Sequence, residues 1–337
     1  MKKNKILITG GSGFIGTNLV KSLLNSKYNK ILNVDNLTYA SNTEYTLLKS
    51  SNYKFIKLNI LNKKKLYETL NDFKPNIIFH LAAQTHVDRS ISGPNLFINT
   101  NFIGTFNLID SYKKIIEANK SIFTNKCKFI HLSTDEVYGD HVSLMIPKSK
   151  ESSILNPSSP YSASKASAEH LVMAWIRTFN FPGIICRISN NYGPFQHTEK
   201  FIPKVIKNCL QRKKIPIYGS GLQSRNWIHV SDTVEALIKV MKHSKIDKTY
   251  NISSDTVLKN IDIVKIIYKL INKKIYKNKI IKLENLISHI DDRLGHDFLY
   301  YIDSSKIKKE LLWKPKIELK KGLESTINWY LMNYKKY

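Results

Sequence analysis

Cysteine and long apolar stretches are both scarce in this sequence of 337 residues. The three cysteines, Cys127, Cys186 and Cys209, are odd in number and unpatterned, which excludes a disulfide framework and a cysteine-based zinc site. No apolar run approaches the roughly 20 residues of a membrane span. The apolar stretch at 6–8 is too short for a secretory signal. We therefore expect no metal site, no membrane partner and a cytoplasmic protein.

Arginine is also rare, with six among the 53 basic residues, although the formal net charge is +27. Proteins that bind the phosphate backbone of nucleic acids tend to use clustered arginine and lysine with interleaved aromatic side chains. Here the lysines are spread along the chain, as solvated surface positions would be. We therefore expect no nucleic acid partner. A hydrophobic content of 42% predicts a globular protein with a buried core.

A glycine-rich turn lies between a predicted strand, Lys5–Thr9, and a predicted helix, Thr17–Leu24. Its glycines are Gly10, Gly13 and Gly16. This spacing suits a tight turn, a close backbone approach to a pyrophosphate and helix–strand packing. A second strand at 30–34 ends at Asp35, whose carboxylate would accept the adenosine ribose hydroxyls and repel a 2′-phosphate. The pattern predicts an NAD site.

Further apolar strands recur at crossover spacing and alternate with helical stretches at 97–117 and 163–180. The strands are Lys54–Leu58, Ile77–Leu81, Lys128–Leu132 and Gly183–Ile188. This alternation predicts an α/β fold of the Rossmann type with a doubly wound parallel sheet. A later strand at 249–253 is expected to rejoin that sheet.

The last third of the chain predicts a smaller C-terminal substrate lobe. The expected NAD-binding domain comprises residues 1–191 plus 229–253. The expected substrate-binding domain comprises residues 192–228 plus 254–337. The second domain is thus discontinuous in the sequence.

Candidate reactive groups follow the strand that ends at Leu132. Thr134, Asp135 and Glu136 are consecutive, and Tyr161 and Lys165 are four residues apart, hence one helical turn from each other. An ammonium beside the phenol is expected to lower the tyrosine pKa and make it a base. Successive side chains of a strand point to opposite faces, so both carboxylates serve one site only if the chain turns at Asp135. We predict that turn.

Together these segments resemble the extended short-chain dehydrogenase/reductase superfamily, and within it the nucleotide-sugar 4,6-dehydratases of the dTDP-glucose 4,6-dehydratase family. The resemblance covers almost the whole chain, and the adjacent Asp135 and Glu136 are its most specific feature. The matching segments are 10–16, 35–39, 80–90, 133–139, 161–165, 189–194, 199–203, 216–219 and 292–297.

The resemblance implies a lyase that converts dTDP-glucose or UDP-glucose to the 4-keto-6-deoxy sugar and water. It implies that Tyr161 takes the O4 proton, with Thr134 bonded to that oxygen and Lys165 at the nicotinamide ribose. Glu136 would then take the C5 proton, and Asp135 would protonate the departing C6 hydroxyl. Hydride leaves C4 and returns to C6.

The resemblance also implies two sets of binding residues. For the cofactor they are Gly10, Gly13, Phe14, Ile15, Gly16, Asp35, Asn36, Leu37, Thr38, Asn59, Ile60, Leu81, Ala82, Ala83, Thr100, Tyr161, Lys165 and Asn191. For the substrate they are Thr85, His86, Thr134, Asn190, Glu199, Lys200, Pro216, Tyr218, Arg225, Asn260, Arg293 and His296.

Two alternatives remain open from the sequence. A nucleotide-sugar 4-epimerase or decarboxylase would share Tyr161 and Lys165 but would not need the adjacent carboxylates. A non-catalytic NAD(H)-sensing module would need none of the reactive groups intact. The resemblance further implies a homodimer through the helices that begin near Phe97 and Ala163.

Overall fold

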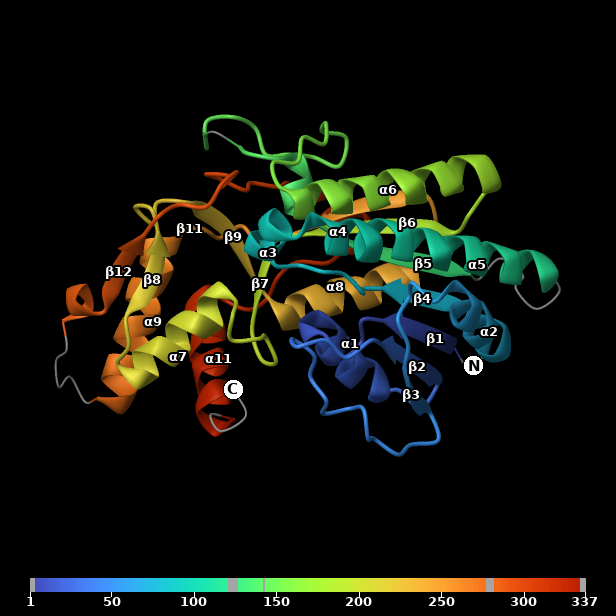
Figure 1. Cartoon of the computed structure of the whole chain (residues 1–337), viewed down its shortest axis with the longest axis horizontal. Coiled ribbons are helices and arrows are strands. Elements are labelled where there is room, and N and C mark those ends of the chain that lie inside the picture. Colours follow the sequence, from blue (N-terminus) through green and yellow to red (C-terminus); the bar gives the residue numbers. More distant parts are fainter. Residues whose placement is uncertain (1–3, 121–126, 142, 277–281, 334–337) are drawn as a thin grey trace.

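The computed structural model describes residues 4–120, 127–141, 143–276 and 282–333. Its centre is a seven-stranded sheet in which every strand pair is parallel. The strands are β1 (Asn4–Thr9), β2 (Asn29–Asp35), β3 (Tyr53–Lys57), β4 (Ile77–His80), β5 (Lys128–Thr134), β6 (Gly183–Ile188) and β10 (Lys248–Ile252). They lie in the order β10-β6-β5-β4-β1-β2-β3, so the predicted doubly wound fold is confirmed (Figure 1).

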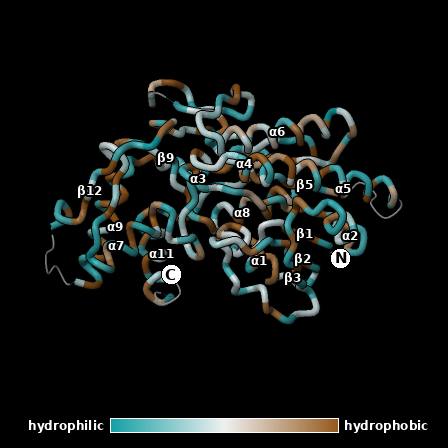
Figure 2. The backbone as a smooth tube through the Cα atoms, viewed as in Figure 1, coloured by the Kyte–Doolittle hydropathy of each residue, from teal (hydrophilic) through white to brown (hydrophobic). Residues whose placement is uncertain are grey.

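Helices cover both faces of this sheet. Side chains alternate along β1: Ile6 and Ile8 pack with α1 (Phe14–Leu24), α8 (Val230–His243) and α10 (Ser305–Leu311), whereas Leu7 packs on the opposite face. The helices of that opposite face are α2 (Lys63–Phe73), α5 (Gly104–Ala118) and α6 (Pro160–Phe179). Burial of both faces explains why the strands read as continuous apolar runs, which Figure 2 shows as hydrophobic segments in the middle of the molecule.

A second region lies at one end of the molecule (Figure 1). Its strands are β7 (Asn190–Tyr192), β9 (Ser224–His229) and β11 (Val257–Lys259), which form one sheet, and β8 (Ile215–Tyr218) and β12 (Ile287–Ile290), which form another. Its helices are α7 (Phe201–Gln211), α9 (Asn260–Ile275) and α11 (Leu319–Met332). These elements share a separate apolar core that includes Ile206, Ile267 and Leu323.

Short elements fill the remaining connections. They are α3 (Val87–Ser92), α4 (Pro94–Phe97), the π-helical η1 (Ile98–Ile103), and the 3-10 helices η2 (Asp135–Tyr138) and η3 (Leu283–Asn285). The helix expected at 97–117 is therefore built from the end of α4, then η1 and α5. Within the described ranges, none of the helices is both long and apolar enough to cross a bilayer.

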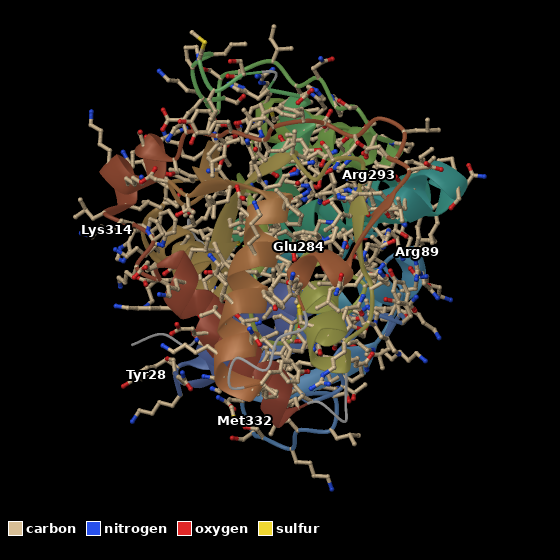
Figure 3. The ribbon with its side chains drawn as sticks, turned by 90° about the vertical axis from the view of Figure 1, so that its left-hand side faces the viewer. Tyr28, Arg89, Glu284, Arg293, Lys314 and Met332 are labelled. Atoms are coloured by element: carbon tan, nitrogen blue, oxygen red, sulfur yellow. The ribbon has the colours of Figure 1, made fainter. Side chains whose placement is uncertain are left out.

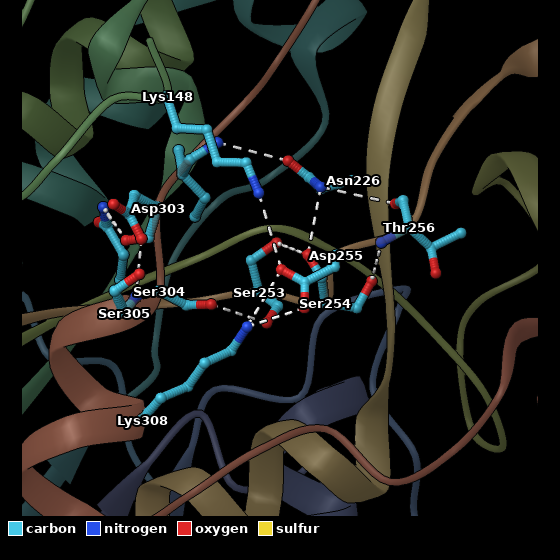
Figure 4. Close-up of polar contacts among 12 residues, drawn as sticks. Lys148, Asn226, Ser253, Ser254, Asp255, Thr256, Asp303, Ser304, Ser305 and Lys308 are labelled. Atoms are coloured by element: carbon cyan, nitrogen blue, oxygen red, sulfur yellow. Dashed lines mark hydrogen bonds and ion pairs between the residues drawn. The ribbon is translucent and has the colours of Figure 1, made fainter.

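A polar network joins the two regions just after β10 (Figure 4). Lys308 in the last turn of α10 contacts both carboxylate oxygens of Asp255, at 3.0 and 2.8 Å. Asn226 of β9 donates to the carbonyl oxygen of Ser254 at 3.3 Å. These contacts hold the edge strand of the main sheet against the second region.

The segment after this network returns to the main sheet. Ile307, Leu311 and Trp313 are buried in the core that packs on α1 and α8. The sequence-based division assigns 254–337 to the substrate lobe, but these three side chains pack against the main sheet. Apolar spacing alone does not tell which of two cores a short helix joins.

Candidate active site

A cleft of about 380 Å³ opens where the strands of the main sheet end. Residues that end or follow five of these strands line it: Gly10, Asp35, Leu81, Thr134 and Ile188. Clefts of a few hundred cubic ångströms at this edge of a parallel sheet are where such folds bind small molecules.

The structure brings almost all of the predicted cofactor residues to the wall of this cleft. Those that line it are Gly10, Gly13, Phe14, Ile15, Gly16, Asp35, Asn36, Thr38, Asn59, Ile60, Leu81, Ala82, Ala83, Thr100, Tyr161, Lys165 and Asn191. Leu37 is not part of the wall. It has a left-handed backbone (φ 54°), and its N–H donates to Asp35 Oδ1 at 2.8 Å.

The glycine turn is built for close backbone approach. Gly10 has φ +74°, and a Cβ at Gly16 would lie 2.1 Å from the Gly10 carbonyl oxygen, so neither position accepts a side chain. Helix α1 begins at Phe14, and among the described residues no side chain caps its first turn. The first N–H groups of a helix need external acceptors, and phosphate oxygens are suited to this role.

Asp35 is held rigidly at the end of β2. Its carboxylate accepts hydrogen bonds from the Ser12 N–H at 3.0 Å and from the Leu37 N–H. Burial raises its pKa, although these backbone hydrogen bonds oppose the shift. A carboxylate accepts about four hydrogen bonds, so lone pairs remain for the hydroxyls of a ribose. The turn and this fixed carboxylate fit NAD.

The two adjacent carboxyl groups lie where β5 gives way to η2. Thr134 is the last strand residue, and its Oγ1 accepts the Glu136 N–H at 3.3 Å, which starts the 3-10 helix at Asp135. The predicted turn at Asp135 is confirmed, and both carboxyl side chains line the cleft. Among the described residues, Asp135 Oδ2 is a buried oxygen with no hydrogen-bond partner.

The environments of these two carboxyl groups affect their pKa values differently. Burial, and then the charge of Glu136, raise the pKa of Asp135 to about 8. Burial also raises the pKa of Glu136, while the cations Arg293, Arg225 and Lys200 pull it down. At neutral pH the arrangement therefore favours a protonated Asp135 beside a Glu136 held among positive charges.

Tyr161 and Lys165 lie on the first turns of α6, across from Thr134. The helix starts with a capping box between Ser159 and Ser162, with Pro160 in its first turn. Tyr161 is 7% exposed, and its phenol is within hydrogen-bonding reach of Thr134. This places both predicted residues on the cleft wall.

The expected lowering of the Tyr161 pKa by Lys165 is wrong. Burial, Glu136 and Asp135 raise that pKa, because a phenolate would be desolvated and would face two carboxyl groups. The Lys165 ammonium donates instead to the Leu132 carbonyl oxygen at 2.7 Å. Burial lowers the Lys165 pKa to about 8. Spacing in the sequence could not reveal this desolvation.

Five of the predicted substrate residues line the same cleft: Thr85, Thr134, Asn190, Glu199 and Lys200. Lys200 donates to the Thr85 carbonyl oxygen at 2.7 Å, which ties the segment before α7 to the loop after β4. The cleft thus continues from the glycine turn past the carboxyl groups to this cationic side.

The remaining predicted substrate residues lie outside the wall. They are His86, Pro216, Tyr218, Arg225, Asn260, Arg293 and His296. Three of them surround Asp88 or Glu199: Tyr218 donates to Asp88 Oδ2 at 2.8 Å, Arg293 lies 3.7 Å from Asp88 Oδ1, and His86 lies 3.8 Å from Glu199 Oε2. Pro216 belongs to β8, Asn260 begins α9, and His296 contacts Asp292.

Sequence reasoning missed several residues of the site. Ser133, Ser189, Gln84 and His197 line the cleft, and the first two follow or end predicted strands, which is a signal that could have identified them. Tyr300 lies beside Glu136, with the Arg225 guanidinium 4.2 Å from the centre of its ring. Nothing local marks Tyr300, because its contacts come from the fold. Figure 3 shows Arg89 and Arg293 on the same side of the molecule.

Comparison with known proteins shows which family the chain belongs to. A family model described as GDP-mannose 4,6 dehydratase matches residues 7–326. The chain belongs to this family of nucleotide-sugar 4,6-dehydratases.

Among its relatives in this dehydratase family, a dTDP-glucose 4,6-dehydratase from Salmonella typhimurium is 42% identical over 98% of this chain and 93% of that protein. The dTDP-glucose 4,6-dehydratase of Bacillus anthracis, crystallised with NAD, is 35% identical with a TM-score of 0.84, covering 99% of this chain and 98% of that one. DesIV of Streptomyces venezuelae, a dTDP-glucose 4,6-dehydratase with NAD and TYD bound, is 32% identical with a TM-score of 0.89 and the same coverage.

Proposed function

We propose that this chain converts dTDP-glucose to its 4-keto-6-deoxy derivative and water. The chain is an NAD-dependent nucleoside-diphosphate-glucose 4,6-dehydratase, a hydro-lyase, as its sequence predicted. The thymine nucleotide is the finer proposal, and the names of the relatives support it. The single observation that carries the chemistry is the pair Asp135 and Glu136, side by side in the cleft with Tyr161.

NAD would lie along the glycine turn and Asp35, with its nicotinamide end toward Tyr161 and Lys165. When bound, it would supply the hydride acceptor for oxidation of C4 and the hydride donor for reduction of C6. The C4 carbonyl present in between would make the C5 hydrogen acidic. The residues of the chain supply the binding and the proton transfers. The buried Lys165 would orient the nicotinamide ribose and keep a positive charge near the Tyr161 oxygen.

As the phenolate, which the positive charges of Lys165 and of bound NAD would stabilise against the burial described above, Tyr161 would take the proton of the sugar 4-hydroxyl as C4 is oxidised. Thr134 would hold that oxygen by a hydrogen bond. Glu136 would then take the C5 proton. Asp135 would give its proton to the C6 hydroxyl, which leaves as water while a C5–C6 double bond forms. When C6 is reduced, the proton on Glu136 returns to C5. Tyr161 then releases the O4 proton to solvent and Asp135 takes one up, so the sugar loses one water and the enzyme is restored.

The raised pKa of Asp135 supports its role as the acid. A carboxyl group with a pKa of about 8 keeps its proton at neutral pH, as a donor to a leaving hydroxyl must. Burial raises the pKa of Glu136, but three nearby cations oppose this shift and favour its carboxylate form before it accepts a proton. The two alternatives, a 4-epimerase or decarboxylase and an NAD(H) sensor, do not account for this pair.

On the substrate side, we assign the diphosphate to the cationic groups Lys200, Arg225 and Arg293. Tyr218 would contact the base, with Pro216 beside it in β8. Asn190, Glu199, Thr85 and His86 would face the sugar or shape its pocket, and Asn260 and His296 would close it. The division into an NAD domain and a sugar-nucleotide domain, the homodimer through η1, α5 and α6, and the cytoplasmic location also remain proposals.

The test is turnover of dTDP-glucose and UDP-glucose by purified protein without added reductant, followed by product mass. We expect loss of one water, faster with dTDP-glucose, and no net NADH. Glu136→Gln is expected to abolish water loss while NAD and nucleotide affinities change less than about threefold. The surface variant Glu117→Gln is the matched control, because that side chain is 52% exposed on α5.

Each outcome decides one part of the proposal. A product of unchanged mass would indicate epimerisation, and no turnover of either sugar would favour a sensor. Equal turnover of the two nucleotides would refute the thymine preference alone. Normal water loss by the Glu136→Gln variant would refute the role assigned to Glu136.

A further inference from the structure

Tyr300 bridges Glu136 and a second buried carboxyl group, Asp297. The Tyr300 hydroxyl oxygen is 2.8 Å from Asp297 Oδ2 and 3.4 Å from Glu136 Oε2. Asp297 and Tyr300 are 5% and 4% exposed, so water does not screen this row of oxygens. Both belong to the loop between β12 and α10, whereas Glu136 belongs to η2.

The hydroxyl has one proton, and the two distances decide where it goes. The contact to Asp297 is shorter by 0.6 Å, so Tyr300 donates to the Asp297 carboxylate. The Tyr300 oxygen then turns its lone pairs toward Glu136. A Glu136 carboxylate facing those lone pairs is disfavoured, whereas a protonated Glu136 can donate a hydrogen bond to them.

Arg225 holds the Tyr300 ring in place and, among the described ion pairs, forms none with Asp297. Its guanidinium stacks on the Tyr300 ring, and its NH1 and NH2 groups donate to backbone carbonyl oxygens of Ser224, Phe298 and Asp297 at 2.8, 3.1 and 2.8 Å. The contacts described for this guanidinium end on backbone oxygens. The Asp297 side chain is therefore left to accept from Tyr300.

We infer that Asp297 is a positioning residue that acts through Tyr300 to make Glu136 a stronger base. The inference rests on the proposed role of Glu136 as the group that removes the C5 proton. By fixing the direction of the Tyr300 hydroxyl, Asp297 destabilises the carboxylate of Glu136 before the transfer and stabilises its acid form afterwards. Asp297 itself need not touch the sugar.

The other charges around Glu136 explain why the effect of Asp297 on its basicity matters. The groups facing it are Asp135 from η2, Tyr161 from α6, Lys200 from the segment before α7, Arg225 from β9, and Arg293, Asp297 and Tyr300 from the loop after β12. The three cations lower the pKa of Glu136, which would weaken it as a base, and Asp297 raises it. Asp297 thus offsets the charges that are needed to hold a diphosphate.

The experiment compares pH profiles of water loss from dTDP-glucose for the wild type and Asp297→Asn. In the variant, the acid limb of kcat, which reports ionisation of Glu136 in the complex, is expected to move to lower pH by about 0.5–1 unit. The plateau of kcat is expected to fall about tenfold, because the base is weaker, and KM is expected to change less than about threefold. A loss of folding alone would not move the limb.

Tyr300→Phe tests whether Asp297 acts on Glu136 through the Tyr300 hydroxyl. Without the hydroxyl, only the charge of Asp297 acts on Glu136, so Asp297→Asn is expected to move the acid limb of the Tyr300→Phe enzyme by clearly less than that of the wild type. An equal shift in both backgrounds, or an unmoved limb in the wild-type background, overturns the inference. Should Asp297→Asn fail to melt cooperatively, the limb of Tyr300→Phe alone decides: a downward shift supports the inference and an unchanged limb refutes it.

The failure of this inference can be told from that of the proposed function. If the wild type releases no water, or if Glu136→Gln releases it normally, the proposed function fails and the inference with it. If both behave as proposed but Asp297→Asn keeps the acid limb of the wild type, only the role of Asp297 is refuted.

Discussion

The Tyr39 hydroxyl donates a 2.8 Å hydrogen bond to Glu199 Oε1, joining the loop after β2 to the segment before α7. The Arg89 guanidinium lies 3.7 Å from the centre of the Tyr39 ring and 3.4 Å from Glu199 Oε2, so it holds both partners. These contacts connect the side of the cleft that fits the cofactor to the side assigned to the sugar.

Removing the Tyr39 hydroxyl should therefore loosen the cleft. A hydrogen bond to a charged group contributes about 1.5–3 kcal/mol when buried, and this one is partly exposed, so we expect less. Tyr39→Phe should raise KM for the nucleotide sugar about three- to tenfold with kcat nearly unchanged. Steady-state kinetics measure this, and Tyr28→Phe, a similarly exposed tyrosine just before β2, should show no effect. Equal KM values for both variants would contradict the prediction.

A methyl group at Gly16 should abolish NAD binding. The added Cβ would lie 2.1 Å from the Gly10 carbonyl oxygen, so the glycine turn must shift away from the position that the phosphates require. We expect Gly16→Ala to weaken NAD binding about 100-fold in calorimetric titration, which is about 2.7 kcal/mol and near the upper end of the usual range of about 1–3 kcal/mol for overpacking. Gly93→Ala is the control, because its Cβ would meet only the Arg89 carbonyl, at 3.6 Å. Normal NAD affinity in Gly16→Ala would contradict the prediction and show that the glycine turn accommodates the added methyl group.

The elimination rate should depend on the proton of Asp135. Its pKa is about 8, so we expect the alkaline limb of the rate to lie near that pH, with the rate falling as the pH rises through it. Asp135→Asn cannot donate that proton and should slow water loss about 10²–10⁴-fold. Rapid-quench measurement of water loss from about pH 6 to about pH 10 checks both statements. A rate that stays level past pH 9, roughly one unit above this pKa, would exclude Asp135 as the acid.

The same shift should affect stability. The folded protein keeps a proton on Asp135 that the unfolded chain releases near the ordinary value of 3.8. This contribution is full below about pH 4 and is lost as the pH rises through about 8. Urea unfolding should therefore show that Asp135→Asn loses less stability than the wild type between these pH values. An equal pH slope for the two proteins would argue against the shift.

The buried ion pair behind the site should be costly to break. Arg187 donates to Glu169 Oε2 through Nε at 2.9 Å and through NH2 at 2.7 Å, and through NH1 to the Tyr138 hydroxyl at 2.7 Å. Arg187→Met leaves Glu169, which is fully buried, without its counter-charge, so we expect a loss of about 3–5 kcal/mol in the free energy of unfolding.

The control for that loss is the surface pair between Lys113 and Glu117, which lie 2.9 Å apart on α5. Lys113→Met should cost less than about 1 kcal/mol, because water screens an exposed pair. Urea denaturation of the two variants gives the comparison. Similar losses in both would mean that burial does not set the cost at Arg187.

What the sequence predicted well is local. The strand, glycine turn and helix around Gly10 are set by neighbouring residues, and the turn at Asp135 follows from the need to bring two successive side chains to one side. What it predicted poorly depends on distant contacts. Tyr300 reaches Glu136 from 164 residues away, and the direction of the Tyr161 pKa shift depends on burial that only the folded chain creates. The same holds for Trp313, whose core could not be chosen from its own segment.

The position of β10 has a consequence for how the protein is made. This strand, Lys248–Ile252, completes the edge of the main sheet beside β6 only after the chain has passed through β7, α7, β8 and β9. About three quarters of the polypeptide must therefore leave the ribosome before the sheet can close. An N-terminal fragment that ends before Lys248 would lack the edge strand and could not form the complete seven-stranded sheet.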